Sequence, residues 1–158
     1  MIKIAFYKGS GSSLLLKATN LLIKVWTMGK YSHCELIISD SKSDRWYSIS
    51  GMGLGIIRRN SNYQYVDSEW DIYSVNTEAS DGELEKLLIL EMGKKYDWVG
   101  IFFCQIFSIN MEDPKRWFCS EYCMASLKKA LILKSNNSAQ STSPNDLVRI
   151  MSDNGILS

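Results

Sequence analysis

The sequence predicts an α+β fold in which a small antiparallel β-sheet packs against helices. Runs of alternating polar and apolar residues, which are typical of strands, recur through the first 75 residues. The second half of the chain instead places apolar residues at three- and four-residue spacing, which is the helical period. The chain has 158 residues, 46% of them apolar, which is enough for one hydrophobic core. We therefore expect a single domain over residues 1–158.

The first half of the chain is expected to supply the sheet. Its alternating runs predict strands at residues 2–7, 31–38, 45–50, 56–59 and 70–75. Between the first two strands, a glycine loop leads into a helix over residues 14–27. The apolar stripe of this helix consists of Leu15, Ala18, Leu22 and Val25. Neither this loop nor the glycine-rich segment 51–55 has the spacing of a phosphate-binding or dinucleotide-binding motif, so we expect no cofactor.

The second half of the chain predicts the helices. Ser80 and Glu83 have the spacing of a capping box, in which the serine caps the first turn and the glutamate reaches back. The apolar face of the helix that follows consists of Leu84, Leu87, Leu88 and Met92. Further helices are expected over residues 98–109 and 120–133, and from Pro144 onward.

Charge and hydropathy restrict the expected partners and location. The 18 basic and 17 acidic residues leave a net charge of +1, so no whole face should attract nucleic acid or an anionic membrane. The longest apolar stretch, residues 98–109, is about half of what a transmembrane helix needs. Residues 1–7 are too short for a secretory signal, so we expect a protein that is cytoplasmic as synthesised, with its four cysteines reduced.

One histidine and one late cysteine carry the candidate chemistry. His33 is the only histidine, and Glu35 lies two residues further along the same strand, so both side chains should share one face. Cys119 precedes a helix, where the helix N-terminus and a nearby imidazolium lower a thiol pKa from about 8.5 to between roughly 3.5 and 7.5. The predicted roles are Cys119 as nucleophile, His33 as its base and Glu35 as the group that orients the imidazole. The chemistry implied is acyl transfer through a thioester.

Three other interpretations use the same residues. Cys119 and Cys123 are four residues apart, so both are also compatible with small core positions on one helix face, as we expect for Cys34 and Cys104. The His33-Cys34-Glu35 run imitates a zinc deaminase motif, but the cysteine pair is one residue too far apart and the run alternates like a strand. We therefore expect no bound metal. The third interpretation is a binding module whose cysteine is inert.

Four segments together resemble a known family. They are Tyr31-Ser32-His33-Cys34-Glu35-Leu36, Lys95-Tyr96-Asp97-Trp98-Val99-Gly100, Phe118-Cys119-Ser120-Glu121 and Ser143-Pro144-Asn145-Asp146-Leu147. This set is similar to the circularly permuted papain-like hydrolases related to the NlpC cell-wall peptidases, found in bacteria, poxviruses and bacteriophages. The order of these segments along the chain carries the resemblance. In the permuted branch the histidine strand precedes the cysteine helix, as His33 precedes Cys119 here.

The resemblance implies an activity and a set of site residues. It implies a cysteine hydrolase that cleaves an amide bond, in a cell-wall peptide or a small peptide conjugate, with Cys119, His33 and Glu35 as its catalytic triad. Ser120 and Glu121 would support the start of the nucleophile helix. A related group, the lecithin retinol acyltransferases, acts on lipid acyl chains, but this sequence lacks their second histidine. If the protein is phage-encoded, packing in the virion or release at lysis would bring it to cell wall.

Overall fold

The computed structural model describes residues 1–9, 14–41, 43–50, 55–59, 68–96 and 116–158. The strands in these ranges are β1 (Ile2–Tyr7), β2 (His33–Ser39), β3 (Asp44–Ser50), β4 (Gly55–Arg59), β5 (Trp70–Ser74), β6 (Lys95–Tyr96) and β7 (Arg116–Trp117). The helices are α1 (Leu14–Trp26), α2 (Asp81–Leu90), α4 (Cys119–Lys129) and α5 (Pro144–Asp153). The predicted helix at 98–109, Cys104 and the glycine segment at 51–54 lie outside the described residues.

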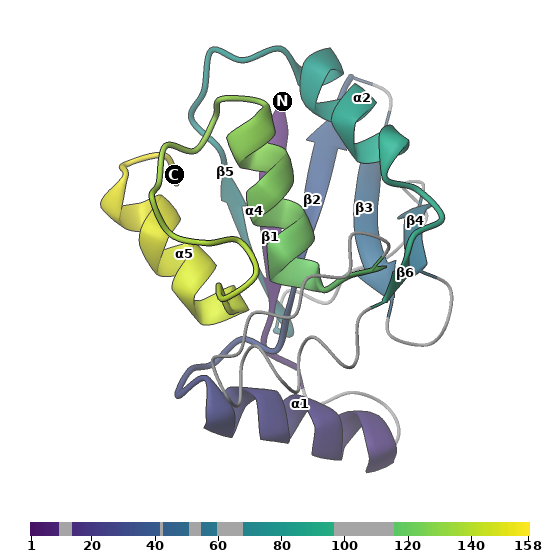
Figure 1. Ribbon diagram of the computed structural model, residues 1–158, viewed down its shortest axis with the longest axis vertical. Coiled ribbons are helices and arrows are strands. Elements are labelled where there is room, and N and C mark those ends of the chain that lie inside the picture. Colours follow the sequence, from purple (N-terminus) through teal and green to yellow (C-terminus); the bar gives the residue numbers. More distant parts are fainter. Residues whose placement is uncertain (10–13, 42, 51–54, 60–67, 97–115) are drawn as a thin grey trace.

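The five strands predicted from alternation form one antiparallel sheet. Its order is β4-β3-β2-β1-β5, so β2 is the central strand (Figure 1). In the register between β1 and β2, Tyr7 lies opposite His33 and Ile2 lies opposite Ile38. The short parallel pair of β6 and β7 was not predicted, because two-residue strands leave no alternating pattern. The structure thus confirms the α+β class with an antiparallel sheet.

The two faces of the sheet differ because side chains alternate along each strand. On one face, Cys34, Leu36 and Ile38 of β2 belong to the main hydrophobic core. On the other face, Ile37 joins a smaller cluster with Ala5, Trp46 and Trp70. His33 and Glu35 have the same parity as Ile37. The side chains of His33, the candidate base, and Cys34, a core residue, therefore lie on opposite faces of β2.

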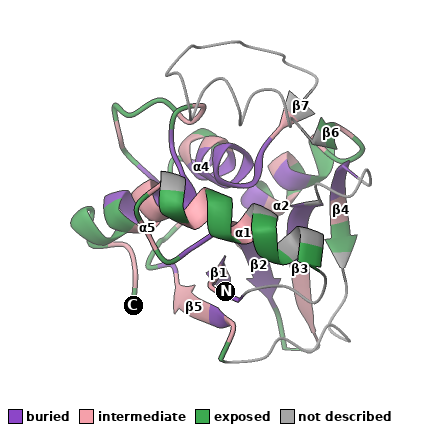
Figure 2. Cartoon of the chain, turned by 90° about the horizontal axis from the view of Figure 1, so that it is seen from below, coloured by how far each residue is buried: buried purple, intermediate pink, exposed green. Residues whose placement is uncertain are grey.

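Helix α4 covers the main core face of the sheet. It contacts β2 and β3 and is flanked by α2 and α5, which gives a layer of helices over the sheet (Figure 1). Its residues from Cys119 to Met124 are all buried, so α4 is enclosed on every side in its first turns (Figure 2). Burial on all sides is typical of a central helix rather than an amphipathic surface helix. The start of α4 is therefore held firmly against β2.

Helix α2 begins where the sequence predicts, but the expected capping box is absent. Ser80 is the N-cap residue, yet its side chain makes no cap hydrogen bond. The carboxylate of Asp81 instead pairs with the N-terminal ammonium group of Met1. Leu84 and Leu88 are buried as predicted, whereas Met92 lies beyond the helix and is exposed.

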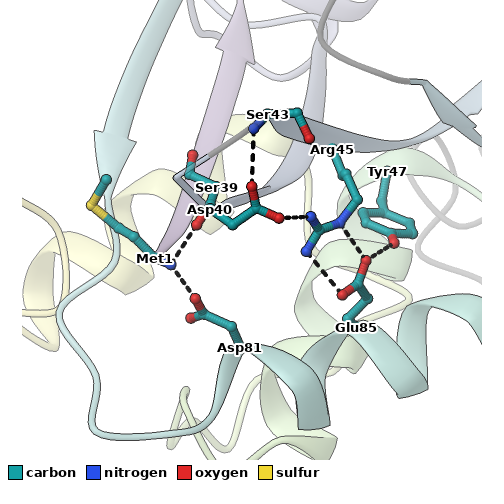
Figure 3. Close-up of polar contacts among 8 residues, drawn as sticks. All are labelled: Met1, Ser39, Asp40, Ser43, Arg45, Tyr47, Asp81 and Glu85. Atoms are coloured by element: carbon teal, nitrogen blue, oxygen red, sulfur yellow. Dashed lines mark hydrogen bonds and ion pairs between the residues drawn. The ribbon is translucent and has the colours of Figure 1, made fainter.

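A charged network joins α2 to the sheet. The guanidinium of Arg45 on β3 donates from Nε to Glu85 Oε1 at 2.6 Å and from a second nitrogen to Glu85 Oε2 at 3.0 Å (Figure 3). It also pairs with Asp40, and the Tyr47 hydroxyl donates to the same Glu85 carboxylate. This network lies where β2 ends and β3 begins, at the opposite end of β2 from His33.

Helix α1 has the opposite orientation from the one its apolar stripe suggests. Three of the four predicted stripe residues, Ala18, Leu22 and Val25, are exposed, together with Leu21, so this side of α1 faces away from the rest of the described structure (Figure 2). The side chain of Leu15, the fourth, lies outside the described ones. An apolar stripe usually marks the core side of a helix, because its burial is the main favourable contribution to packing. In the described part of the chain, no helix is both long enough and apolar enough to cross a membrane.

Candidate active site

His33 and Glu35 lie side by side at the start of β2, as the alternation predicts. His33 Nε2 is 3.2 Å from Glu35 Oε1. The Glu35 side chain is 2% exposed and that of His33 is 22% exposed, so the carboxylate is buried while the imidazole reaches the surface. Ser48 on β3 places its Oγ 3.5 Å from the same Nε2. The sequence did not identify Ser48, because only the β2–β3 register brings it next to the imidazole.

Cys119 is the first residue of α4, which confirms the predicted position at a helix start. The N-cap is Phe118, whose side chain has no hydrogen-bonding group, so the helix start needs another acceptor. Glu121 Oε2 accepts the backbone N–H of Phe118 at 3.4 Å. Glu121 therefore supports the helix start, as expected. Ser120 is also buried, and within the described residues its Oγ has no hydrogen-bond partner.

The Cys119 thiol and the His33 imidazole interact and change each other's protonation. Burial lowers the pKa of His33, but the negative charge and hydrogen bond of Cys119, together with Glu35, raise that pKa to about 10. The pKa of Cys119 lies well below its ordinary value. A hydrogen bond from Cys34 is the main cause; burial opposes it, and the His33 imidazolium adds to the lowering. Both shifts favour the form of the pair in which Cys119 is a thiolate and His33 an imidazolium.

Cys34 contributes to the site from the opposite side of β2. Its side chain is buried in the main core, as predicted, and its Sγ lies 3.8 Å from Cys123 Sγ. Burial raises the pKa of Cys34 well above its ordinary value, and hydrogen bonding to Cys119 raises it further. Cys34 therefore keeps its proton, and its S–H lies within hydrogen-bonding reach of both the Cys123 and the Cys119 sulfur. The prediction that Cys34 is only a core residue was incomplete, because α4 lays Cys119 across the face that Cys34 occupies.

The start of β2 is fixed by a side chain from α5. Asn145 Oδ1 accepts the backbone N–H of Tyr31 at 3.0 Å, and its Nδ2 donates to the Tyr31 carbonyl at 2.8 Å. The same Nδ2 donates to Thr27 Oγ1 at 2.8 Å, just beyond α1. These bonds satisfy both backbone groups of a residue two positions before His33. Asn145 thus aligns the strand that carries the imidazole, a role that its sequence position did not indicate.

The arrangement supplies the parts of a thiol-based acyl-transfer site. It brings together a buried cysteine at a helix N-terminus, a histidine that interacts with this cysteine, and a carboxylate that contacts Nε2 of the same imidazole. Among the described residues, no group of three or more His, Cys, Asp or Glu side chains is arranged to hold a metal ion. The described cysteines Cys34, Cys119 and Cys123 are free thiols.

No protein-family model matches this sequence, and no curated protein matches it significantly.

Proposed function

We propose that the protein is a cysteine hydrolase that cleaves an amide bond through a thioester intermediate. One observation carries the proposal: the His33 imidazole interacts with both the Cys119 thiol and the Glu35 carboxylate, and its Nε2 lies 3.2 Å from Glu35 Oε1. A thiol becomes an effective nucleophile when a nearby base and a helix N-terminus favour its thiolate form. Cys119 meets both conditions.

We propose a permuted papain-like architecture for this hydrolase. The support is the order of elements along the chain, since β2 with His33 precedes α4 with Cys119. A second point of support is the packing of α4 directly over β2, which makes the helix start and the strand start neighbours. The antiparallel sheet flanked by helices agrees with that architecture.

The first half of the proposed reaction forms the thioester. The Cys119 thiolate attacks the carbonyl carbon of the amide and gives a tetrahedral intermediate with a negatively charged oxygen. The first backbone N–H groups of α4 have no partner within the helix, so they are the donors we assign to this oxygen. The His33 imidazolium then gives its proton to the leaving nitrogen, the C–N bond breaks, and an amine departs.

The second half of the proposed reaction releases the acid. Neutral His33 takes a proton from water, and the resulting hydroxide attacks the thioester carbon. The C–S bond then breaks and returns the electron pair to the Cys119 sulfur, which restores the thiolate and imidazolium. Glu35 keeps its contact with Nε2 throughout, so that the other ring nitrogen faces the sulfur.

The proposed substrate class is a peptide amide, in cell-wall peptide or in a small peptide conjugate. Esters and thioesters of acyl lipids form the same thioester intermediate, so they are the second substrate class. The zinc deaminase alternative is less well supported, because His33 and Glu35 lie on a strand, whereas a deaminase motif begins a helix.

Selective alkylation of thiols tests the site without knowledge of the substrate. The protein would be treated briefly with limiting iodoacetamide at pH 6, and the labelled cysteine located by peptide mapping. We expect labelling at Cys119 that exceeds labelling at Cys123, which is buried on the same helix and serves as the internal control. In His33→Ala the labelling of Cys119 should fall by about 10²-fold, because the thiol loses its imidazolium partner.

Equal, slow labelling of all cysteines would overturn the activated thiol and favour an inert binding module. Zinc measured in the same purified protein would instead support a metal site. If Cys119 is labelled selectively, a panel of peptide amides, esters and thioesters then distinguishes the two substrate classes.

A further inference from the structure

Helix α1 presents an apolar surface that nothing in the described structure covers. The large apolar side chains on this surface, which are between 61% and 93% exposed, are Leu14, Leu21, Leu22, Val25 and Met28. Those from Leu14 to Val25 recur at helical spacing along one side of α1, over about 16 Å, and Met28 follows just beyond the end of the helix. Figure 2 shows the exposed colour running along α1, in contrast to the buried α4 behind it. Leaving so many leucines in water is unfavourable, which indicates a surface that is covered when the protein functions.

The charge around α1 identifies the kind of surface that would cover it. Residues 1–34 contain five lysines and no aspartate or glutamate, although the chain as a whole is nearly balanced. Three of these lysines pair with carboxylates of the sheet, Lys3 with Asp44 and both Lys8 and Lys30 with Asp71. The basic charge that remains on this segment is that of the two lysines of α1, Lys17 and Lys24. Lys17 is exposed on the same side as the leucines, and α1 itself carries no acidic residue. An apolar helix face with basic and no acidic groups is complementary to an anionic lipid surface.

We propose that α1 docks on the surface of an anionic lipid bilayer, lying in its plane with Leu21, Leu22 and Val25 inserted among the acyl chains. The phosphate groups of the lipids would pair with Lys17. A second copy of the chain fits this surface less well. A two-fold interface would place Lys17 of one copy near Lys17 of the other, and α1 has no carboxylate to offset the repulsion between these two positive charges. The helix lies on the membrane and does not cross it.

The docked position would bring the candidate site close to the bilayer. Helix α1 lies at the end of the molecule where β2 and α4 begin, which is where His33 and Cys119 lie (Figure 1). The hydrogen bond between Asn145 and Thr27 links the end of α1 to the start of α5 at the same end. Binding is measured without turnover, so this proposal does not depend on the role of Cys119.

The test is sedimentation of the whole protein with vesicles. Vesicles of phosphatidylcholine with about one third phosphatidylglycerol would be compared with vesicles of phosphatidylcholine alone. The double variant Leu21→Asp, Val25→Asp disrupts the proposed surface, and Leu90→Asp is the matched control, since Leu90 is an equally exposed helical leucine at the end of α2. Lys17→Gln keeps the apolar surface and removes only its charge.

We expect the parent and Leu90→Asp to bind the anionic vesicles and the double variant to bind at least tenfold more weakly. Lys17→Gln should bind about fivefold more weakly, which corresponds to about 1 kcal/mol for one lysine near an anionic surface. Circular dichroism would confirm that each variant is folded. Failure of the parent to bind, or undiminished binding by the folded double variant, would overturn the proposal. A dimer in light scattering that the double variant dissociates would overturn it in favour of a second copy.

Discussion

The two ends of β2 carry polar clusters made of similar interactions with different consequences. At one end, Arg45 pairs with Glu85 and Asp40, and these contacts raise the pKa of Arg45 and lower that of Glu85. At the other end, the Cys119 contact raises the pKa of His33, and the His33 contact helps to lower that of Cys119. Both ends therefore combine hydrogen bonds with opposite charges.

The difference lies in where the ordinary pKa values fall. Arginine and glutamate are already charged at neutral pH, so their shifts only reinforce the state they would have in water. A cysteine and a histidine are mostly neutral at pH 7, so the same kind of shift favours transfer of a proton from sulfur to nitrogen. The Arg45 end is thus a structural link, whereas we propose that the Cys119 end is a reactive pair. The predictions below separate these two roles.

The largest effect should follow removal of the sulfur. Cys119→Ala is expected to lower kcat/KM by about 10⁴-fold or more, because no other group forms the thioester. Arg45→Met, at the opposite end of β2, should leave kcat/KM unchanged. Hydrolysis of the best substrate from the amide and ester panel measures both. Residual activity in Cys119→Ala near the parental level would exclude it as the nucleophile.

The pH dependence of turnover should report the protonation states of Cys119 and His33. Turnover requires thiolate Cys119 and imidazolium His33, so activity is lost in acid as the thiolate is protonated. It is also lost in alkali as pH rises through about 10, where His33 loses its proton. Because the two groups interact, the acid and alkaline limits of activity are apparent pKa values of the Cys119–His33 pair and not of either residue alone. A profile of kcat/KM against pH tests this, and an alkaline decline near pH 6.5 would show an unperturbed histidine.

Glu35→Gln should have a smaller effect than loss of the sulfur. The amide keeps the size of the carboxylate and a contact with Nε2, but it removes the charge that stabilises the imidazolium. We expect kcat/KM to fall by about 10²-fold and the alkaline limit of the pH profile to move to lower pH. An unchanged pH profile would indicate that Glu35 is only a packing residue.

The role of Cys34 can be isolated by a pair of substitutions. Cys34→Ser keeps a hydrogen-bond donor beside Cys119, whereas Cys34→Ala removes it. We expect iodoacetamide labelling of Cys119 at pH 6 to slow by about tenfold in the alanine variant and to change little in the serine variant. Equal rates in both variants would show that the Cys34 thiol does not act on the Cys119 sulfur.

The smallest effect is expected at the Arg45 end and should concern stability alone. Arg45→Met removes the bonds to Glu85 and Asp40, both of which are partly exposed to solvent. We expect the free energy of unfolding to fall by about 1 kcal/mol, and by less at high salt. Urea denaturation measures the change, and labelling of Cys119 should stay at the parental rate. Slower labelling would mean that the two ends of β2 are coupled.

Much of the fold was predictable because local pattern and tertiary contact agree over most of the chain. The alternation at residues 2–7 and 70–75 predicts strands, and both strands appear in the sheet, β1 largely buried and β5 mostly half-buried. The Ser143-Pro144 start of α5 was predictable from its own capping chemistry, since Ser143 caps the helix. At Ser80 the same pattern marks the N-cap position correctly, but the serine side chain makes no cap hydrogen bond there.

The candidate site was predictable in part. His33 and Glu35 share a strand, and their neighbouring positions follow from its two-residue period. Cys119 at a helix start was predictable from the helical spacing that follows it. Ser48, Asn145 and the thiol of Cys34 were not recognised, because each reaches the site from another strand, another helix or the opposite face of β2.

The sequence by itself determined the secondary structure and the chemical types available to the site, because strand and helix periods and one histidine are local properties. Only the tertiary structure decided that the Cys34 thiol interacts with Cys119 and that Ala18, Leu22 and Val25 of α1 are exposed. The physical reason is that hydrophobic pattern specifies which side chains can be buried, whereas the arrangement of elements determines which surface covers them.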